Sequence, residues 1–69
     1  MKNKMFLSIV IPVYNGENTI SRCLDSIWNQ GLNENEYEII CVDDCSTDNT
    51  IKILSDIQKK HINLRLFVE

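Results

Sequence analysis

The chain has 69 residues, of which seven are basic and ten are acidic, giving a formal net charge of −3 at pH 7. A chain of this size forms one small domain or part of a larger one, so we expect no deep, self-contained enzyme pocket. The acidic balance argues against a nucleic-acid partner, and 43% hydrophobic residues exclude the composition of a disordered chain.

The apolar runs are too short to cross a bilayer, because residues 9–13 and 39–42 are only strand-sized. The N-terminal segment lacks the long apolar core of a signal peptide. We therefore expect a cytoplasmic chain, or one at the cytoplasmic face of a membrane, and membrane association stays open. Cys23, Cys41 and Cys45 form no CxxC pair, which argues against a zinc site or disulfides. We expect Cys23 and Cys41 to be buried as small apolar residues.

Residues 6–13 are almost continuously apolar, which predicts a strand covered on both faces. Pro12 lies near its end, where a strand tolerates a missing N–H, and Asn15-Gly16 predicts a turn. From Glu17 the hydrophobic period becomes helical, and Gly31 marks the stop. The apolar face of this helix consists of Ile20, Cys23, Leu24, Ile27 and Trp28, with Glu17 in the first turn.

Residues 37–42 predict a second strand, residues 50–60 a second helix and residues 62–68 a third strand. His61 is interpreted as a helix-end residue. Helical crossovers imply a parallel sheet, and right-handed connections give the strand order 3-2-1. We therefore predict a three-layer α/β fold, the first half of a Rossmann-like domain. The first strand would then have an unpaired edge, so we expect residues 1–69 to be a fragment or a truncated product.

Ligands of parallel sheets bind at the carboxyl ends of the strands, and two polar segments follow strands there. Their candidate binding residues are Pro12, Val13, Tyr14, Asn15 and Glu17 after the first strand, and Asp43, Asp44 and Ser46 after the second. An aromatic ring can stack on a base, and a carboxylate can accept hydrogen bonds from a base or a ribose. The alternatives are purely local roles in turns, helix caps and loops. Two carboxylates can also bind a divalent cation, but no further ligand cluster is visible.

Two segments of the chain resemble the opening of family 2 glycosyltransferases. They are Ser8-Ile9-Val10-Ile11-Pro12-Val13-Tyr14-Asn15-Gly16-Glu17 and Glu38-Ile39-Ile40-Cys41-Val42-Asp43-Asp44-Cys45-Ser46-Thr47-Asp48. The resemblance extends over essentially the whole chain. It departs from the family pattern at Cys45, where the family usually has glycine, which puts the conformation of that loop in question.

The resemblance implies a GT-A fold and transfer of a sugar from a nucleotide sugar, often a UDP-sugar, to a carbohydrate or glycolipid acceptor in polysaccharide or glycoconjugate synthesis. It implies that Pro12 and Tyr14 border the base, with Tyr14 stacked on it. It also implies that Asp44 hydrogen-bonds the base, that Asp43 supports the loop, and that Glu17 lies near the nucleotide.

In the family that the chain resembles, the metal-binding DxD motif and the catalytic base follow the segment that residues 1–69 resemble, so they have no counterpart here. The resemblance therefore implies that a full-length enzyme uses Mn²⁺ or Mg²⁺ bound mostly by residues outside this chain. Residues 1–69 would contain no catalytic and no metal-binding residue of their own. We expect them to bind the donor nucleotide and to lack transferase activity.

Two alternatives remain open from the sequence. Asp43-Asp44 after an apolar strand also resembles the acidic pair of response-regulator receiver domains, although in receivers that pair follows the first strand. The chain can also be a truncated, non-catalytic nucleotide-binding module.

Overall fold

Strands and helices alternate along the part of the chain that the computed structural model describes, residues 7–69. The strands are β1 (Leu7–Val13), β2 (Tyr37–Asp43) and β3 (Leu64–Val68), and the helices are α1 (Ile20–Trp28) and α2 (Thr50–Gln58). The predicted element order is confirmed, with both helices shorter than their patterns suggested. The expectations for the N-terminal segment, including Phe6 in the first strand, fall outside the described residues.

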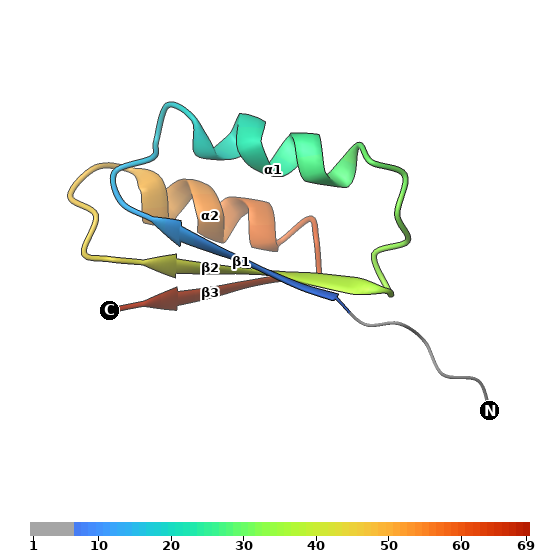
Figure 1. Ribbon diagram of the computed structural model, residues 1–69. Helices are drawn as coiled ribbons and strands as arrows, with labels where there is room; N and C mark the ends of the chain where they lie inside the picture. The colour runs from blue at the N-terminus through green and yellow to red at the C-terminus, as the bar shows by residue number, and fades with distance from the viewer. Residues whose placement is uncertain (1–6) are drawn as a thin grey trace.

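The three strands form one parallel sheet in the order β1-β2-β3, as predicted (Figure 1). The register places Val13 beside Asp43 and Asp43 beside Val68, so the strands end at the same level. The loops that follow β1 and β2 are therefore neighbours. No helix within residues 7–69 is long and apolar enough to span a bilayer.

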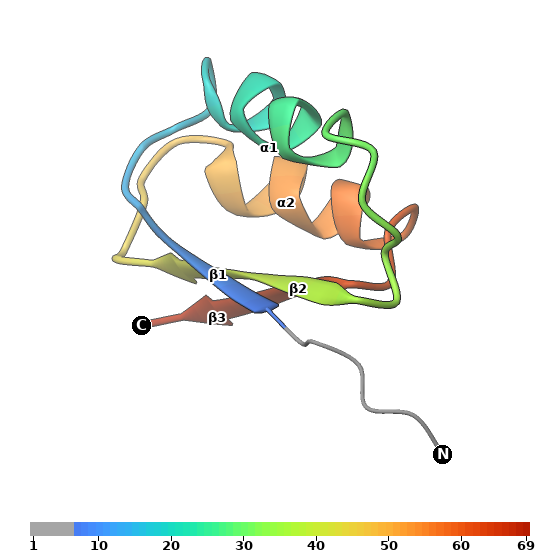
Figure 2. The same cartoon turned by 45° about the vertical axis from the view of Figure 1, so that its right-hand side comes forward.

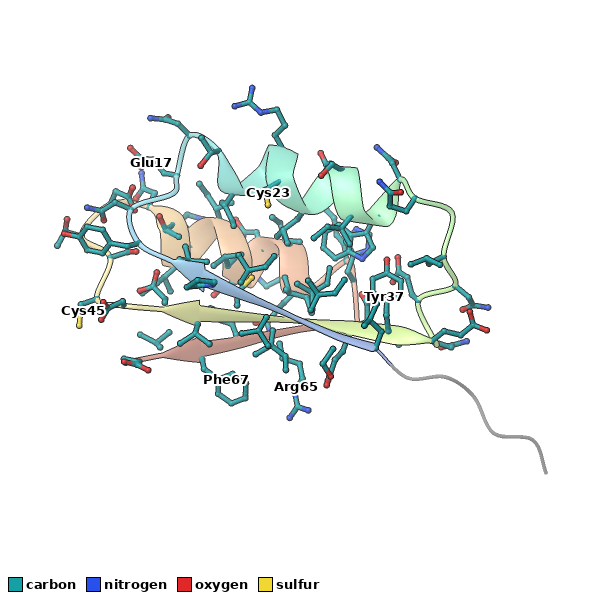
Figure 3. All side chains as sticks on the ribbon, in the orientation of Figure 1. Glu17, Cys23, Tyr37, Cys45, Arg65 and Phe67 are labelled. Carbon is teal, nitrogen blue, oxygen red and sulfur yellow. The ribbon has the colours of Figure 1, made fainter. Side chains whose placement is uncertain are left out.

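Both helices cover the same face of the sheet (Figures 1 and 2). This follows from the topology, because successive right-handed crossovers that step across a sheet in one direction return on the same side. The described residues thus form two layers, sheet and helices, where the sequence predicts three. On the other face, Arg65 and Phe67 point away from the helices (Figure 3), and Val10 is 60% exposed.

Within residues 7–69, β1 has a strand partner on one edge only. Leu7 N–H donates to Glu36 O, and Val13 O accepts from Asp44 N–H, so the backbone groups of these residues face β2. Backbone groups alternate between the two edges of a strand, which places the nitrogen of Pro12 on the free edge. The missing proline N–H therefore costs the sheet no hydrogen bond.

The core lies between the sheet and the helices, where Leu24, Ile39 and Leu54 are fully buried. Each such side chain contributes about 1.5–3 kcal/mol to folding. Cys41 is also buried, and burial raises the pKa of its thiol to about 11, so it behaves as the small apolar residue that was predicted. The prediction was wrong for Cys23, which is exposed. It lies beside β1, where no further described element covers α1.

Tyr37 yields a stability prediction, because its side chain is 2% exposed and, among the described residues, its hydroxyl has no hydrogen-bond partner. A buried, unpartnered hydroxyl destabilises a fold, so Tyr37→Phe should raise the free energy of unfolding by about 1 kcal/mol. Urea unfolding followed by fluorescence of the single tryptophan measures this. Tyr14→Phe, at an exposed tyrosine, is the control and should change nothing. A Tyr37→Phe variant less stable than wild type would contradict this reading.

Candidate nucleotide site

The candidate site lies at the carboxyl edge of the sheet, where residues 14–19 and 44–49 form the loops after β1 and β2 (Figure 1). Asp44 N–H donates to Val13 O at 2.9 Å, so the sheet ladder continues into the start of the second loop. All of the predicted site residues lie at this edge. The structure shows which of their side chains are already used in holding the loops.

The adjacent residues Asp43 and Asp44 differ in their surroundings. Asp43 is fully buried, and its carboxylate accepts hydrogen bonds from the Ser46 N–H at 2.9 Å and the Ser46 hydroxyl at 2.5 Å. Asp44 is exposed. Asp43 therefore shapes the loop, and the carboxylate of Asp44 remains accessible.

Asn15 joins the two loops. Its backbone N–H donates to the Ser46 hydroxyl at 2.8 Å, and its side-chain oxygen accepts from the Thr47 N–H at 2.8 Å. Asn15 has a φ of 49°, the left-handed region that asparagine tolerates better than most residues. Gly16 does not have a positive φ, and a Cβ at that position would make only ordinary contacts. The residue that makes the predicted turn possible is therefore Asn15.

Glu17 also acts across the loops. The prediction that it lies in the first turn of α1 was wrong, because that helix begins at Ile20. Its carboxylate instead accepts a hydrogen bond from the N–H of Asn49, the residue that precedes α2, at 3.0 Å. A carboxylate at this position also interacts favourably with the positive end of the α2 dipole.

A second set of contacts involves the start of α2. Gly16 N–H donates to the Thr50 hydroxyl at 2.8 Å, and that hydroxyl donates to the Asp48 carboxylate. The other oxygen of Asp48 accepts from Glu17 N–H at 3.3 Å. The hydrogen bond from the Thr50 side chain, with further bonds from backbone N–H groups, lowers the pKa of Asp48 below its usual value. Asp48 therefore stays ionised as an acceptor at neutral pH.

Tyr14 has the most accessible aromatic ring at this edge, with 63% of its surface exposed. Together with the exposed Pro12 and with Cys23, it borders a surface pocket of about 210 Å³ beside β1 and α1. Val13 is in the core, so its side chain is not available to a ligand in the open loops. Tyr14, Asp44 and Pro12 are thus the predicted site residues whose side chains are free to meet a ligand.

The described residues do not form a metal centre of their own. Within residues 7–69, no three histidine, cysteine, aspartate or glutamate side chains gather where they could hold a cation. Both oxygens of Asp43 already accept hydrogen bonds from Ser46, which leaves Asp44 as the accessible carboxylate of the pair.

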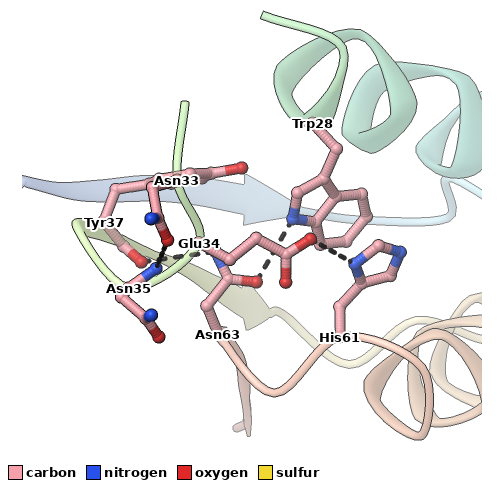
Figure 4. Close-up of polar contacts among 7 residues, drawn as sticks. All are labelled: Trp28, Asn33, Glu34, Asn35, Tyr37, His61 and Asn63. Carbon is pink, nitrogen blue, oxygen red and sulfur yellow. Dashed lines mark hydrogen bonds and ion pairs between the residues drawn. The ribbon is translucent and has the colours of Figure 1, made fainter. Parts of the chain in front are cut away.

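A polar cluster at the opposite, amino-terminal end of the sheet was not predicted (Figure 4). The Trp28 indole stacks on the His61 ring with centroids 3.7 Å apart, and His61 Nδ1 lies 3.0 Å from a carboxylate oxygen of Glu34. Trp28 Nε1–H donates to Asn63, whose side chain donates to Tyr37 O. These residues are scattered in the sequence, and no local pattern connects them.

An open pocket of about 410 Å³ adjoins this cluster and is larger than the pocket beside Tyr14. Its carboxylates are already in use, because Glu34 contacts His61 and Glu38 contacts Arg65 and Ser8. The pocket therefore offers few free polar groups, and we interpret the cluster as structural.

The backbone conformation of Cys45 gives a testable stability prediction for the loop after β2. It has a φ of 59°, and its thiol lies 3.3 Å from Glu69 O. A left-handed backbone suits glycine and penalises β-branched residues most. Cys45→Val should therefore lower the free energy of unfolding by about 1–3 kcal/mol, and Cys45→Gly should stay within about 1 kcal/mol of wild type. Chemical denaturation measures both, and equal stability of the two variants would disprove this conformation.

The family model for glycosyl transferase family 2 matches residues 8–69. The chain is 57% identical over 60 residues to the poly(ribitol-phosphate) beta-glucosyltransferase of Bacillus spizizenii, an alignment that covers 87% of this chain and 10% of that protein. Against the crystal structure of Staphylococcus aureus TarS 1-349 in complex with UDP-GlcNAc, the TM-score is 0.83 at 35% identity, over 94% of this chain and 18% of that one.

Against the mannosyltransferase PcManGT of Pyrobaculum calidifontis in complex with GDP-Man and Mn²⁺, the TM-score is 0.79 at 27% identity, over 97% of this chain and 19% of that one. The chain thus spans between a tenth and a fifth of the length of these proteins. The match to the family model extends over nearly all of the chain, and the parallel α/β fold is that of the GT-A neighbours. The chain belongs to glycosyl transferase family 2.

Proposed function

We propose that this chain is the donor-nucleotide-binding part of a glycosyltransferase that uses a UDP-sugar. The observation that carries the proposal is the pair of accessible side chains, Tyr14 and Asp44, on two loops at the carboxyl edge of the sheet. The loops are joined by hydrogen bonds in which Asn15 and Glu17 take part. These bonds hold the loops that carry the Tyr14 ring and the Asp44 carboxylate in a defined relative position.

The two side chains suit the two parts of a nucleoside. The Tyr14 ring offers a flat surface on which a base can stack. The Asp44 carboxylate, when ionised, only accepts hydrogen bonds, so it suits a base N–H or a ribose hydroxyl. In support of uridine, the relative solved with UDP-GlcNAc is 35% identical to this chain, whereas the one solved with GDP-Man is 27% identical.

The remaining site residues are proposed to act by holding the loops. Asn15, Glu17, Asp43 and Ser46 use their side chains in the hydrogen bonds between and within the loops. Pro12 borders the base beside Tyr14. Val13 supports the first loop from the core, where its side chain is buried.

We further propose that residues 1–69 are part of the N-terminal half of a GT-A domain and that other residues carry out the transfer. An activated sugar reaches an acceptor hydroxyl only if a base removes the proton and the leaving diphosphate is stabilised. Neither role is assigned to a side chain described here. A divalent cation would supply the second role, and the acceptor would be a polysaccharide or glycoconjugate of undetermined structure. The match to the family model over residues 8–69 leaves no support for a receiver domain.

Calorimetric titration of the chain with UDP tests the proposal. Tyr14→Ala should weaken binding about 5- to 150-fold, the range that the loss of one stacked base contact gives. Asp44→Ala should weaken it about tenfold or more, because a hydrogen bond to a charged group is lost. Tyr14→Phe keeps the ring and should bind within about twofold of wild type. Asp25→Ala removes an exposed carboxylate of α1 and is the matched control for Asp44.

Two results would reject the proposal. One is the absence of measurable UDP binding by the wild-type chain at millimolar nucleotide. The other is binding that survives both Tyr14→Ala and Asp44→Ala unchanged, because the nucleotide would then occupy another surface.

A further inference from the structure

We propose that Thr50, acting with Asp48, is the positioning residue of the nucleotide site. This inference rests on the proposed function. It adds two residues, Thr50 and Asp48, that were not among the predicted site residues. Thr50 is the first residue of α2 and is fully buried, and it lies where the loops after β1 and β2 meet the helix. Its hydroxyl contacts both loops.

The direction of each hydrogen bond follows from the donors available. Gly16 N–H can only donate, so the Thr50 oxygen accepts from it, at 2.8 Å. The single hydroxyl proton of Thr50 is then directed to the Asp48 carboxylate. Asp48 also accepts the backbone N–H of Thr50 at 2.9 Å. The hydroxyl is thus used once as acceptor and once as donor, which serine could also do and valine, of the same shape as threonine, could not.

Asp48 extends the contact to the next residue of the first loop. Its second carboxylate oxygen accepts the Glu17 N–H at 3.3 Å. The consecutive amides of Gly16 and Glu17 are therefore held by side chains of the second loop and of α2. Tyr14 lies two residues before Gly16, and Asp44 lies four residues before Asp48. The contact through Thr50 consequently fixes the position of the Tyr14 ring relative to the Asp44 carboxylate.

Burial distinguishes this contact from the other ties between the loops. Asn15 and Thr47 are exposed, so water can replace their hydrogen bonds when one is lost. Thr50 is fully buried, and water does not reach its oxygen without rearrangement. If the hydroxyl is removed, Gly16 N–H loses its partner and the first loop has to shift to find another. The loss should therefore displace Tyr14, which lies two residues before Gly16 in the same loop.

The test compares Thr50→Val, which keeps the shape of the side chain, with Thr50→Ser, which keeps the hydroxyl. UDP affinity is measured by calorimetry, and hydrogen exchange of the Gly16 and Glu17 amides is measured by NMR without nucleotide. We expect Thr50→Val to bind UDP at least tenfold more weakly and to lose protection at Gly16. Thr50→Ser should bind within threefold of wild type and keep that protection. UDP affinity of Thr50→Val equal to that of wild type would overturn the inference.

Two further variants separate positioning from general stability. Ile39→Val weakens the core without touching either loop, so it should lower the thermal midpoint and leave UDP affinity unchanged. Asp48→Asn tests the contact without altering Thr50, should Thr50→Val fail to fold. It should release the Glu17 amide and weaken UDP binding by at least threefold. Unchanged affinity and unchanged Glu17 protection in Asp48→Asn would also overturn the inference.

The proposed function and this inference fail in different ways. If the wild-type chain binds no UDP, the proposed function is rejected, and the exchange of the Gly16 and Glu17 amides still decides whether Thr50 and Asp48 hold the loop. If wild type and Thr50→Val bind UDP equally well, the nucleotide site stands and only the positioning role is lost.

Discussion

A parallel sheet creates a hydrogen-bonding problem at its carboxyl edge, where the chain leaves each strand and has no ladder to satisfy its amides. In this protein, each of the two loops supplies hydrogen-bond acceptors to the backbone amides of the other. The first loop supplies acceptors to the second, as the Asn15 amide does for Thr47. The second loop and α2 supply acceptors to the first, as Ser46 and Thr50 do. The hydrogen bonds between the loops therefore add to those within each loop, such as the bonds from Ser46 to Asp43.

Polar residues that look alike in the sequence have two different roles in these loops: some hold the loops together, and others have accessible side chains. Asp43 and Asp44 are neighbours with the same side chain, yet one is buried against Ser46 and the other is exposed. Tyr14 is free in the same way as Asp44. Because the supporting residues satisfy the backbone, the two accessible side chains are not needed to hold the fold. Both side chains are therefore accessible to a ligand while the hydrogen bonds of the loops stay in place.

The fold could be predicted because its elements depend on local hydrophobic period, and parallel order follows from helical crossovers. For the candidate site, the sequence predicted which loops lie together but not which side chains hold them. The positive φ of Asn15 rather than Gly16, and the contact of Glu17 with Asn49, arise from partners about 30 residues away. The stack of Trp28 on His61 has the same origin. Cys23 was misplaced because helical period identifies a face but not where the sheet beneath it ends.

The central claim is that the loops after β1 and β2 form a nucleotide site, and an NMR titration of the isotope-labelled chain with UDP tests it most directly. The account predicts that the largest shifts lie at Tyr14, Asp44 and the amides of Gly16 and Glu17. Trp28, the single tryptophan, lies at the opposite end of the sheet, so its indole signal should stay constant. Shifts centred on Trp28 and His61, with none at Tyr14 or Asp44, would contradict the account.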